Sequence, residues 1–263
     1  MRICQLERSV RRTNVRLGEY NTGNEISERD CVRTAGGGWD CTDPPLVIPI
    51  EQFIVHEGYR PWDPNKRNDI ALLRLKYTAP YTCRNRSQTA AASASKKRVT
   101  SKRMPLQSGW PITGGRVLSG GRSCRDFIRP ICLPSTDVTQ DPPEDIALYA
   151  AGWGALNITT VHSDIKQHTS LPFTNFTECQ SIYLRKYKHV ELWNKQLCVG
   201  GRDGRDTCRK DSGGPLMYEN GRVYEVVAVV SFGPSTCGGA AVAPGVYTKV
   251  HEYNAWIRSH IRP

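Results

Sequence analysis

The sequence predicts an all-β fold made of short strands, with a single helix at the C-terminus. Segments rich in Val, Ile, Leu and Tyr recur along the chain, and Gly, Pro, Asn and Asp separate them at short intervals. Short strands punctuated in this way are typical of an all-β sandwich or barrel. The candidate strands lie at residues 15–20, 70–75, 147–152, 225–232 and 245–250.

The candidate strands differ in their patterns. Residues 15–20 alternate between apolar and polar side chains and end near an Asn-x-Gly turn, as expected of a half-buried strand. The later candidates are mostly apolar and indicate buried strands. The C-terminal helix is predicted because apolar side chains recur there at a spacing near 3.6 residues. They are Val250, Tyr253, Trp256, Ile257 and Ile261.

The charge of the chain is concentrated in one segment. The 263 residues include 36 Lys and Arg and 25 Asp and Glu, a formal net charge of +11. Residues 83–125 hold ten of the basic side chains and no acidic one, which leaves 26 basic and 25 acidic residues elsewhere. The segment is rich in Ala, Ser, Thr and Gly and has no sustained period, so we expect a disordered insertion. It is either an arm that binds polyanions or a solvated insertion without function.

The cysteine content points to an oxidising compartment. Ten Cys residues occur without any Cys-x-x-Cys pair, which favours disulfides over a zinc site. Three Asn-x-Ser/Thr sequons, at Asn85, Asn157 and Asn175, agree with secretion to the extracellular space. Since the charged N-terminus has no apolar signal core, we expect the chain to be incomplete at its start. No run of about 18 apolar residues exists, so no membrane-spanning helix is predicted.

The stretch Asp-Ser-Gly-Gly-Pro at residues 211–215 has the composition of a nucleophile loop. Glycines next to Ser212 would let the backbone approach a reacting carbonyl and direct N–H groups at its oxygen. The spacing alone is equally that of an ordinary loop. Other segments of the chain decide between the two.

Together, these segments resemble the chymotrypsin/trypsin-like serine peptidase family (S1). Asn-Asp-Ile-Ala-Leu-Leu at residues 68–73 resembles the segment of the catalytic Asp. Ala-Gly-Trp-Gly at 151–154, Val-Ser-Phe-Gly at 230–233 and Pro-Gly-Val-Tyr-Thr at 244–248 follow in the family's order. The resemblance covers roughly residues 15–82 and 126–263. Within the family, residues 15–20 and 31–45 look most like arthropod clip-domain proteases, which act in cascades of melanisation and Toll signalling.

The resemblance implies a double antiparallel β-barrel of trypsin type with a C-terminal helix. Residues 1–263 would form one peptidase domain. Residues 1–82 would supply an incomplete first barrel, and residues 126–263 the connector, the second barrel and the helix. Removing residues 83–125 would join these two parts as one continuous family stretch. We therefore hypothesise that this segment is translated non-coding sequence.

The resemblance also assigns roles to individual residues. Ser212 would be the acyl-forming nucleophile, and Asp69 would orient a catalytic His. The backbone N–H groups of Lys210 and Ser212 would form the oxyanion hole. Asp206 would lie at the base of a specificity pocket and bind the Arg or Lys side chain of a protein substrate. The residues that would line that pocket are Ser231, Phe232, Gly233 and Gly245.

Further expectations concern bridges, cofactors and partners. The implied disulfides are Cys179–Cys198, Cys208–Cys237 and Cys31–Cys41, and Cys132 usually ties the domain to an upstream segment. No catalytic cofactor and no catalytic metal are implied, although a structural calcium ion in the loop around residues 19–45 is compatible with the family. Expected partners are protein substrates and serpin inhibitors. We expect a monomer that binds neither nucleic acid nor membrane.

Three departures from the family bear on catalysis. The catalytic His is not found, since the only His before Asp69 is His56, which matches a non-catalytic stretch. The Ile-Val-Gly-Gly activation segment, whose amine would pair with Asp211, does not occur in residues 1–14. Lys210 replaces a Gly of the family, so its side chain disfavours the required backbone geometry. We therefore expect a secreted trypsin-like endopeptidase by family whose 263-residue chain is inactive as written. The alternative is a non-catalytic serine protease homologue acting as a cofactor or binding module.

Overall fold

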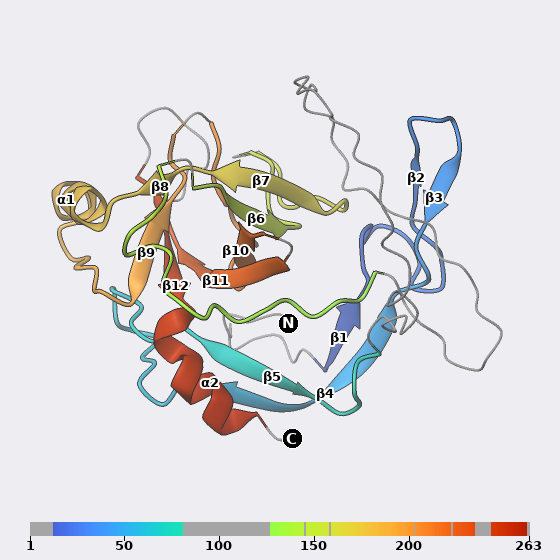
Figure 1. Cartoon of the computed structure of the whole chain (residues 1–263), viewed down its shortest axis with the longest axis horizontal. Coiled ribbons are helices and arrows are strands. Elements are labelled where there is room, and N and C mark those ends of the chain that lie inside the picture. The colour runs from blue at the N-terminus through green and yellow to red at the C-terminus, as the bar shows by residue number, and fades with distance from the viewer. Residues whose placement is uncertain are drawn as a thin grey trace, which may run out of the picture.

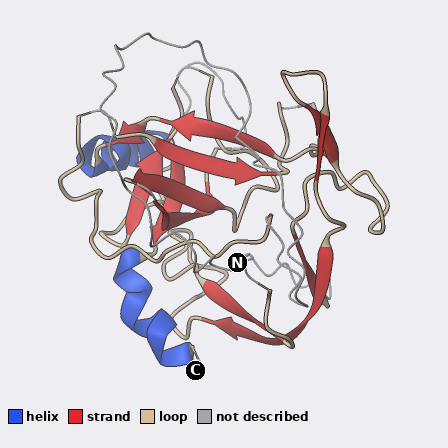
Figure 2. Cartoon of the chain, turned by 45° about the vertical axis from the view of Figure 1, so that its right-hand side comes forward, coloured by secondary structure: helices blue, strands red, loops and turns tan. Residues whose placement is uncertain are grey.

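The chain folds mainly into antiparallel β-sheet (Figures 1 and 2). The structure is a computed structural model. It describes residues 13–80, 127–144, 146–157, 159–202, 204–221, 223–234 and 243–261. The insertion predicted at residues 83–125 lies outside them. The first strands are β1 (Asn14–Leu17), β2 (Cys31–Arg33), β3 (Trp39–Cys41), β4 (Leu46–Val55) and β5 (Ala71–Leu75). The later strands are β6 (Leu148–Gly152), β7 (Gln167–Leu171), β8 (Phe173–Thr174), β9 (Gln196–Val199), β10 (Pro215–Asn220), β11 (Val223–Phe232) and β12 (Gly245–Lys249).

The N-terminal part of the chain forms a small sheet and a hairpin. The three strands of the sheet are ordered β1-β4-β5, and all pairs are antiparallel. Strands β2 and β3 pair only with each other, with Cys31 opposite Cys41, and this hairpin projects from the body of the molecule (Figure 1). The described residues thus hold only part of a first barrel.

The C-terminal part forms a seven-stranded antiparallel sheet in the order β7-β6-β10-β11-β12-β9-β8. Its two end strands, β7 and β8, are neighbours in the chain and are separated only by Pro172. Because proline has no N–H to give to a ladder, the strand is interrupted there, and its two pieces pair with β6 and β9 respectively. The sheet therefore curls until its ends meet, as the six-stranded second barrel requires.

The described residues include three helical segments, one between β8 and β9 and two after β12. They are α1 (Phe176–Lys186), the 3-10 turn η1 (His251–Tyr253) and α2 (Asn254–His260). Helix α2 lies along the β4–β5 side of the molecule in Figure 1 and buries Ile257. Helix α1 was not predicted from the sequence. No helix in the described part is long and apolar enough to span a membrane.

One hydrophobic cluster lies inside the second half of the chain, and another joins the two halves. One fills the curled sheet and includes Leu148, Leu171 and Tyr247. The other joins Ile70 of the first half to side chains of β11 and the C-terminal helix, among them Ile257. Burying such side chains stabilises the fold by about 1.5–3 kcal/mol each. The segment that ends at Ile70 is thereby fixed against the second sheet, which positions the residue before it.

The predicted fold class is confirmed. The structure is mostly β, with a curled sheet and a C-terminal helix. The predicted apolar face of the C-terminal helix was wrong at one position, since Ile261 lies beyond α2 and is 53% exposed.

Candidate active site

Asp69 lies where the two halves of the molecule meet. It directly precedes Ile70 and the start of β5, so the buried apolar segment fixes its backbone. The Ser231 hydroxyl, on β11, donates to Asp69 Oδ2 at 2.6 Å, and the Thr248 hydroxyl, on β12, donates to the Asp69 carbonyl at 2.9 Å. Both contacts cross from the second sheet to the first half of the chain.

The environment of Asp69 acts on its charge in opposite directions. Burial raises the pKa of its carboxyl group above the ordinary value, because the charged form loses hydration. The hydrogen bond from Ser231 and the nearby charge of Lys66 oppose this effect by favouring the carboxylate. The net result is a raised pKa for a carboxyl group that is held in one orientation.

The loop that carries Ser212 is held by the preceding residue, Asp211. Its carboxylate accepts N–H bonds from Gly154 at 2.9 Å and Cys208 at 3.0 Å, and its carbonyl accepts from Gly214. Any side chain at Gly154 would collide with this carboxylate, since a Cβ there would lie 2.3 Å from its carbon. Burial raises the pKa of Asp211 while the two N–H donors oppose the shift. The Ser212 hydroxyl itself has no hydrogen-bond partner in the described part of the chain.

Lys210 adopts a backbone conformation that normally belongs to glycine. Its φ is +73°, in the left-handed region, where a side chain costs about 1–2 kcal/mol. The residue thus takes glycine-like geometry despite its side chain. Within the described ranges, the N–H groups of Lys210 and Ser212 donate to no acceptor, so both remain available to an incoming oxygen.

Asp206 presents one unsatisfied carboxylate oxygen. Oδ1 accepts the Thr207 N–H at 2.8 Å, whereas Oδ2 is buried and has no hydrogen-bond partner among the described residues. Burial raises the pKa of this carboxyl group to about 7, with a further rise from Asp211 and an opposing effect of the Thr207 N–H. Gly245 lies against it, since a Cβ there would be 3.4 Å from Oδ1. A buried oxygen of this kind calls for a donor or cation.

Sequence reasoning missed one pair next to Asp206. The hydroxyls of Thr207 and Tyr247 are hydrogen-bonded at 2.7 Å, and Tyr247 is fully buried in β12. Burial strongly raises the pKa of Tyr247, which keeps its hydroxyl protonated. Thr207 could have been singled out because it follows Asp206 directly, but its partner lies 40 positions away.

Of the four residues expected to line the pocket, two have side chains that contact other residues, and the other two are glycines that lie close together. The hydroxyl of Ser231 is engaged with Asp69, and the ring of Phe232 packs edge-on against Tyr183 at 6.0 Å. The side chains of Ser231 and Phe232 therefore contact Asp69 and Tyr183. Gly233 and Gly245 lie close together, since a Cβ on Gly233 would be 3.4 Å from the Gly245 Cα.

His56 does not take the place of the catalytic His. Its Nδ1 accepts the Gly58 N–H at 3.0 Å, and its ring packs against Tyr253 and Trp256 with centroids 5.3 and 5.0 Å away. Burial lowers its pKa despite the neighbouring charge of Glu57. Among the described residues, no His bonds to the carboxylate of Asp69.

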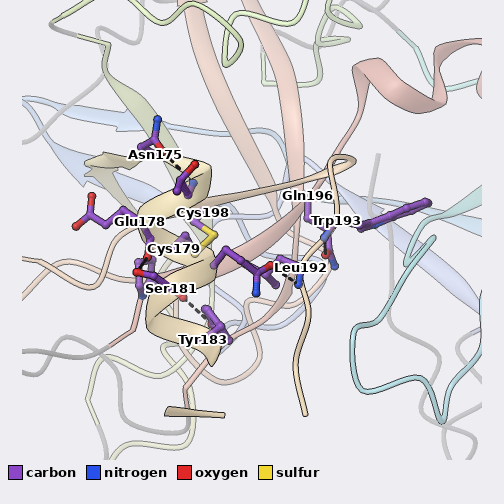
Figure 3. The surroundings of a disulfide bond; sticks show 12 residues. Asn175, Glu178, Cys179, Ser181, Tyr183, Leu192, Trp193, Gln196 and Cys198 are labelled. Carbon is purple, nitrogen blue, oxygen red and sulfur yellow. Dashed lines mark hydrogen bonds between the residues drawn. A yellow bond between two sulfur atoms is a disulfide. The ribbon is translucent and has the colours of Figure 1, made fainter. Parts of the chain in front are cut away.

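Two of the implied disulfides are present. Cys31–Cys41 closes the β2–β3 hairpin, and Cys179–Cys198 joins α1 to β9 (Figure 3). Cys208 is also disulfide-bonded, but its expected partner Cys237 lies outside the described residues. Cys132 is a free, exposed thiol in the structure.

Protein donors engage the carboxylates of the loop around residues 19–45, where a structural calcium ion stays a prediction. The Asp30 carboxylate accepts N–H bonds from Tyr20, Asn21 and the Asn24 side chain. The Glu19 carboxylate is engaged by Arg16 at 3.3 Å and by the backbone of Tyr20. Because N–H donors already occupy these oxygens, the loop is held by protein contacts. No group of three or more His, Cys, Asp or Glu side chains suited to a metal occurs in the described part.

Comparison with known proteins places this site in a family. The model of the trypsin family matches residues 42–122 and 116–257, which include Asp69, Asp206 and Ser212. The chain belongs to the trypsin family of serine proteases. Proteases of this family are hydrolases that need no cofactor.

The relatives of this trypsin-family chain include insect clip-domain proteases. It is 42% identical to the phenoloxidase-activating enzyme of Bombyx mori, over 95% of this chain and 47% of that protein. It is 34% identical to serine protease ea of Drosophila melanogaster, over 95% of this chain and 53% of that protein. The chain thus spans about half the length of these relatives.

Solved structures agree with this assignment. The Drosophila Grass clip serine protease of the Toll pathway superposes with a TM-score of 0.61 at 27% identity. The match covers 93% of this chain and 55% of that one. Mouse neuropsin, at 20% identity and the same TM-score, supports the fold alone.

Proposed function

We propose that this chain is the catalytic part of a secreted trypsin-like endopeptidase that cleaves after Arg or Lys. The observation that carries the proposal is the buried, unpaired Oδ2 of Asp206. A guanidinium or ammonium group would supply both the missing hydrogen bond and the countercharge. Gly233 and Gly245 nearby carry no side chains that would block a long substrate side chain.

The arrangement around Ser212 supports an acyl-transfer reaction. The Ser212 hydroxyl would attack the scissile carbonyl, and the free N–H groups of Lys210 and Ser212 would stabilise the developing oxyanion. Asp69, held by Ser231, would orient and stabilise a protonated His. Since no His contacts Asp69 in the described residues, we propose that the 263-residue chain alone does not acylate. A serine without its base is a weak nucleophile.

The names of the relatives support a role in an extracellular proteolytic cascade. They include a phenoloxidase-activating enzyme, a Spaetzle-processing enzyme and melanization protease 1. On this proposal, the chain acts as a monomer on protein substrates with Arg or Lys at the cleavage site. Serpins would be its inhibitors.

The specificity proposal is tested by calorimetric titration of the chain with benzamidine, an aryl amidinium that carries the charge of an Arg side chain. We expect binding by the wild-type chain and binding at least about 30-fold weaker for Asp206→Asn, because a buried charge pair loses one partner. Asp141→Asn, which removes an exposed carboxylate, is the matched control and should bind as wild type. Equal affinity of the wild type and Asp206→Asn would contradict the proposed specificity.

A second candidate is a non-catalytic serine protease homologue that binds cascade components. The absence of a His partner for Asp69 among the described residues favours it. The two candidates predict different protease activity when the missing catalytic His is supplied. A longer version that carries the family's His segment should become active after cleavage if the chain descends from a working protease. A true non-catalytic homologue would stay inactive.

A further inference from the structure

The connection between β6 and β7 is a loop that carries one of the three sequons (Figure 1). Its stems are tied down: the Ser163 N–H donates to the Trp153 and Gly154 carbonyls at 3.1 Å, and Ala155 N–H donates to the Arg209 carbonyl at 2.9 Å. The loop therefore leaves the body of the protein in a defined place. Asn157 lies near its start, with Thr159 as the third residue of the sequon.

The side chain of Asn157 is arranged with its amide nitrogen free. Its Oδ1 accepts from the Thr159 N–H at 2.9 Å, the Thr159 hydroxyl at 2.7 Å and the Thr160 N–H at 2.9 Å. The Asn157 residue is exposed, and its Nδ2 makes no hydrogen bond within the described residues. The sequon hydroxyl thus bonds the carbonyl oxygen of the same amide whose nitrogen would be modified.

Two large apolar side chains flank this asparagine in solvent. Leu156 is 60% exposed and Val161 is 65% exposed. Both side chains belong to the same loop as the sequon, one and four positions from Asn157. A glycan on Asn157 would cover them.

The start of the loop also contacts the segment that precedes Ser212. Gly154, three residues before Asn157, donates its N–H to the carboxylate of Asp211, which precedes Ser212. A branched sugar attached at Asn157 would therefore extend from the segment next to the reactive serine. It would limit the approach of large partners more than that of short peptides.

We propose that Asn157 is N-glycosylated and that its glycan covers Leu156 and Val161 on this loop. The donor is a lipid-linked oligosaccharide diphosphate. Its C1–O bond to the diphosphate breaks and a bond from C1 to Asn157 Nδ2 forms. One amide proton is lost as the lipid diphosphate leaves. The proposal rests on the secreted location proposed above.

The test expresses the full chain behind a heterologous secretion leader in insect cells. The secreted protein is treated with a peptide-N-glycosidase in heavy-oxygen water, and its peptides are read by mass spectrometry. We expect most Asn157 to be converted to labelled Asp. Asn157→Gln and Thr159→Ala should each remove one glycan. Thr160→Ala, which alters the loop outside the sequon, should keep it.

Secretion with an unmodified Asn157 would overturn the proposal, whatever the state of Asn175. If a variant is not secreted, translation with microsomes gives the same readout as a shift in electrophoretic mobility. Because the leader fixes the route of export, this result is independent of where the natural protein resides.

If the glycan covers Leu156 and Val161, Asn157→Gln should bind more of an apolar dye than wild type. Adding Leu156→Ser and Val161→Ser should reverse that increase, and equal dye binding by wild type and Asn157→Gln would refute the role.

Discussion

At the scale of single residues, the carboxyl group of Asp206 decides what the site can bind. One of its oxygens accepts the Thr207 N–H, and the other is buried with no partner in the part of the chain that the structure describes. Its pKa is raised from an ordinary value of 3.8 to about 7, mainly by burial. In the folded protein it is therefore neutral in acid and ionised only near neutrality and above.

This pKa predicts that cation binding depends on pH. Benzamidine should bind the ionised form of Asp206, so its affinity should fall as pH decreases below 7. The expected loss is about tenfold for each pH unit below the pKa. Calorimetric titrations between pH 5 and 8 measure it. A flat profile would show that Asp206 does not contact the cation.

Lys210 has a backbone conformation that suits glycine better than lysine. Its φ of +73° suits glycine, so Lys210→Gly should relieve strain. After allowing for the greater entropy of unfolded glycine, we expect a gain of about 0.5–1 kcal/mol in the free energy of unfolding. Chemical denaturation measures the change. Arg209→Gly, at a neighbouring position without positive φ, is the control and should destabilise.

At the scale of secondary-structure elements, the two α-helices show what sequence patterns can and cannot reveal. The C-terminal helix was predicted because Tyr253 and Ile257 repeat at helical spacing, and both are buried. Helix α1 was missed because it buries only Cys179 and Tyr183 and depends on other contacts. Asn175 caps its start by accepting the Thr177 N–H, and a disulfide fixes it to β9.

The packing of α2 predicts a sharp contrast between two isoleucines. Ile257 is buried in the cluster that includes Ile70, so Ile257→Ala should cost about 2–5 kcal/mol in the free energy of unfolding. Ile261 is exposed, so Ile261→Ala should change it by less than about 0.5 kcal/mol. Thermal and urea unfolding of both variants provide the measurement. Similar losses from both would mean that α2 is not docked as described.

At the scale of the whole molecule, the site exists only because the two halves meet. The motifs around Asp69, Asp206 and Ser212 could be read from the sequence one at a time. Their partners could not, because the bond from Ser231 to Asp69 spans 162 positions of the chain. The closure of the second sheet at Pro172 is likewise a property of strand pairing rather than of any local pattern.

As a unit, the chain brings Asp69 and Ser212 of the proposed site into one fold, and among the described residues no His bonds to the Asp69 carboxylate. The most direct measurement is labelling of the purified 263-residue chain with a fluorophosphonate probe, read at Ser212 by mass spectrometry. We expect no labelling above that of Ser212→Ala, because no base contacts the Ser212 hydroxyl among the described residues. Stoichiometric labelling of Ser212 in the wild-type chain would contradict it.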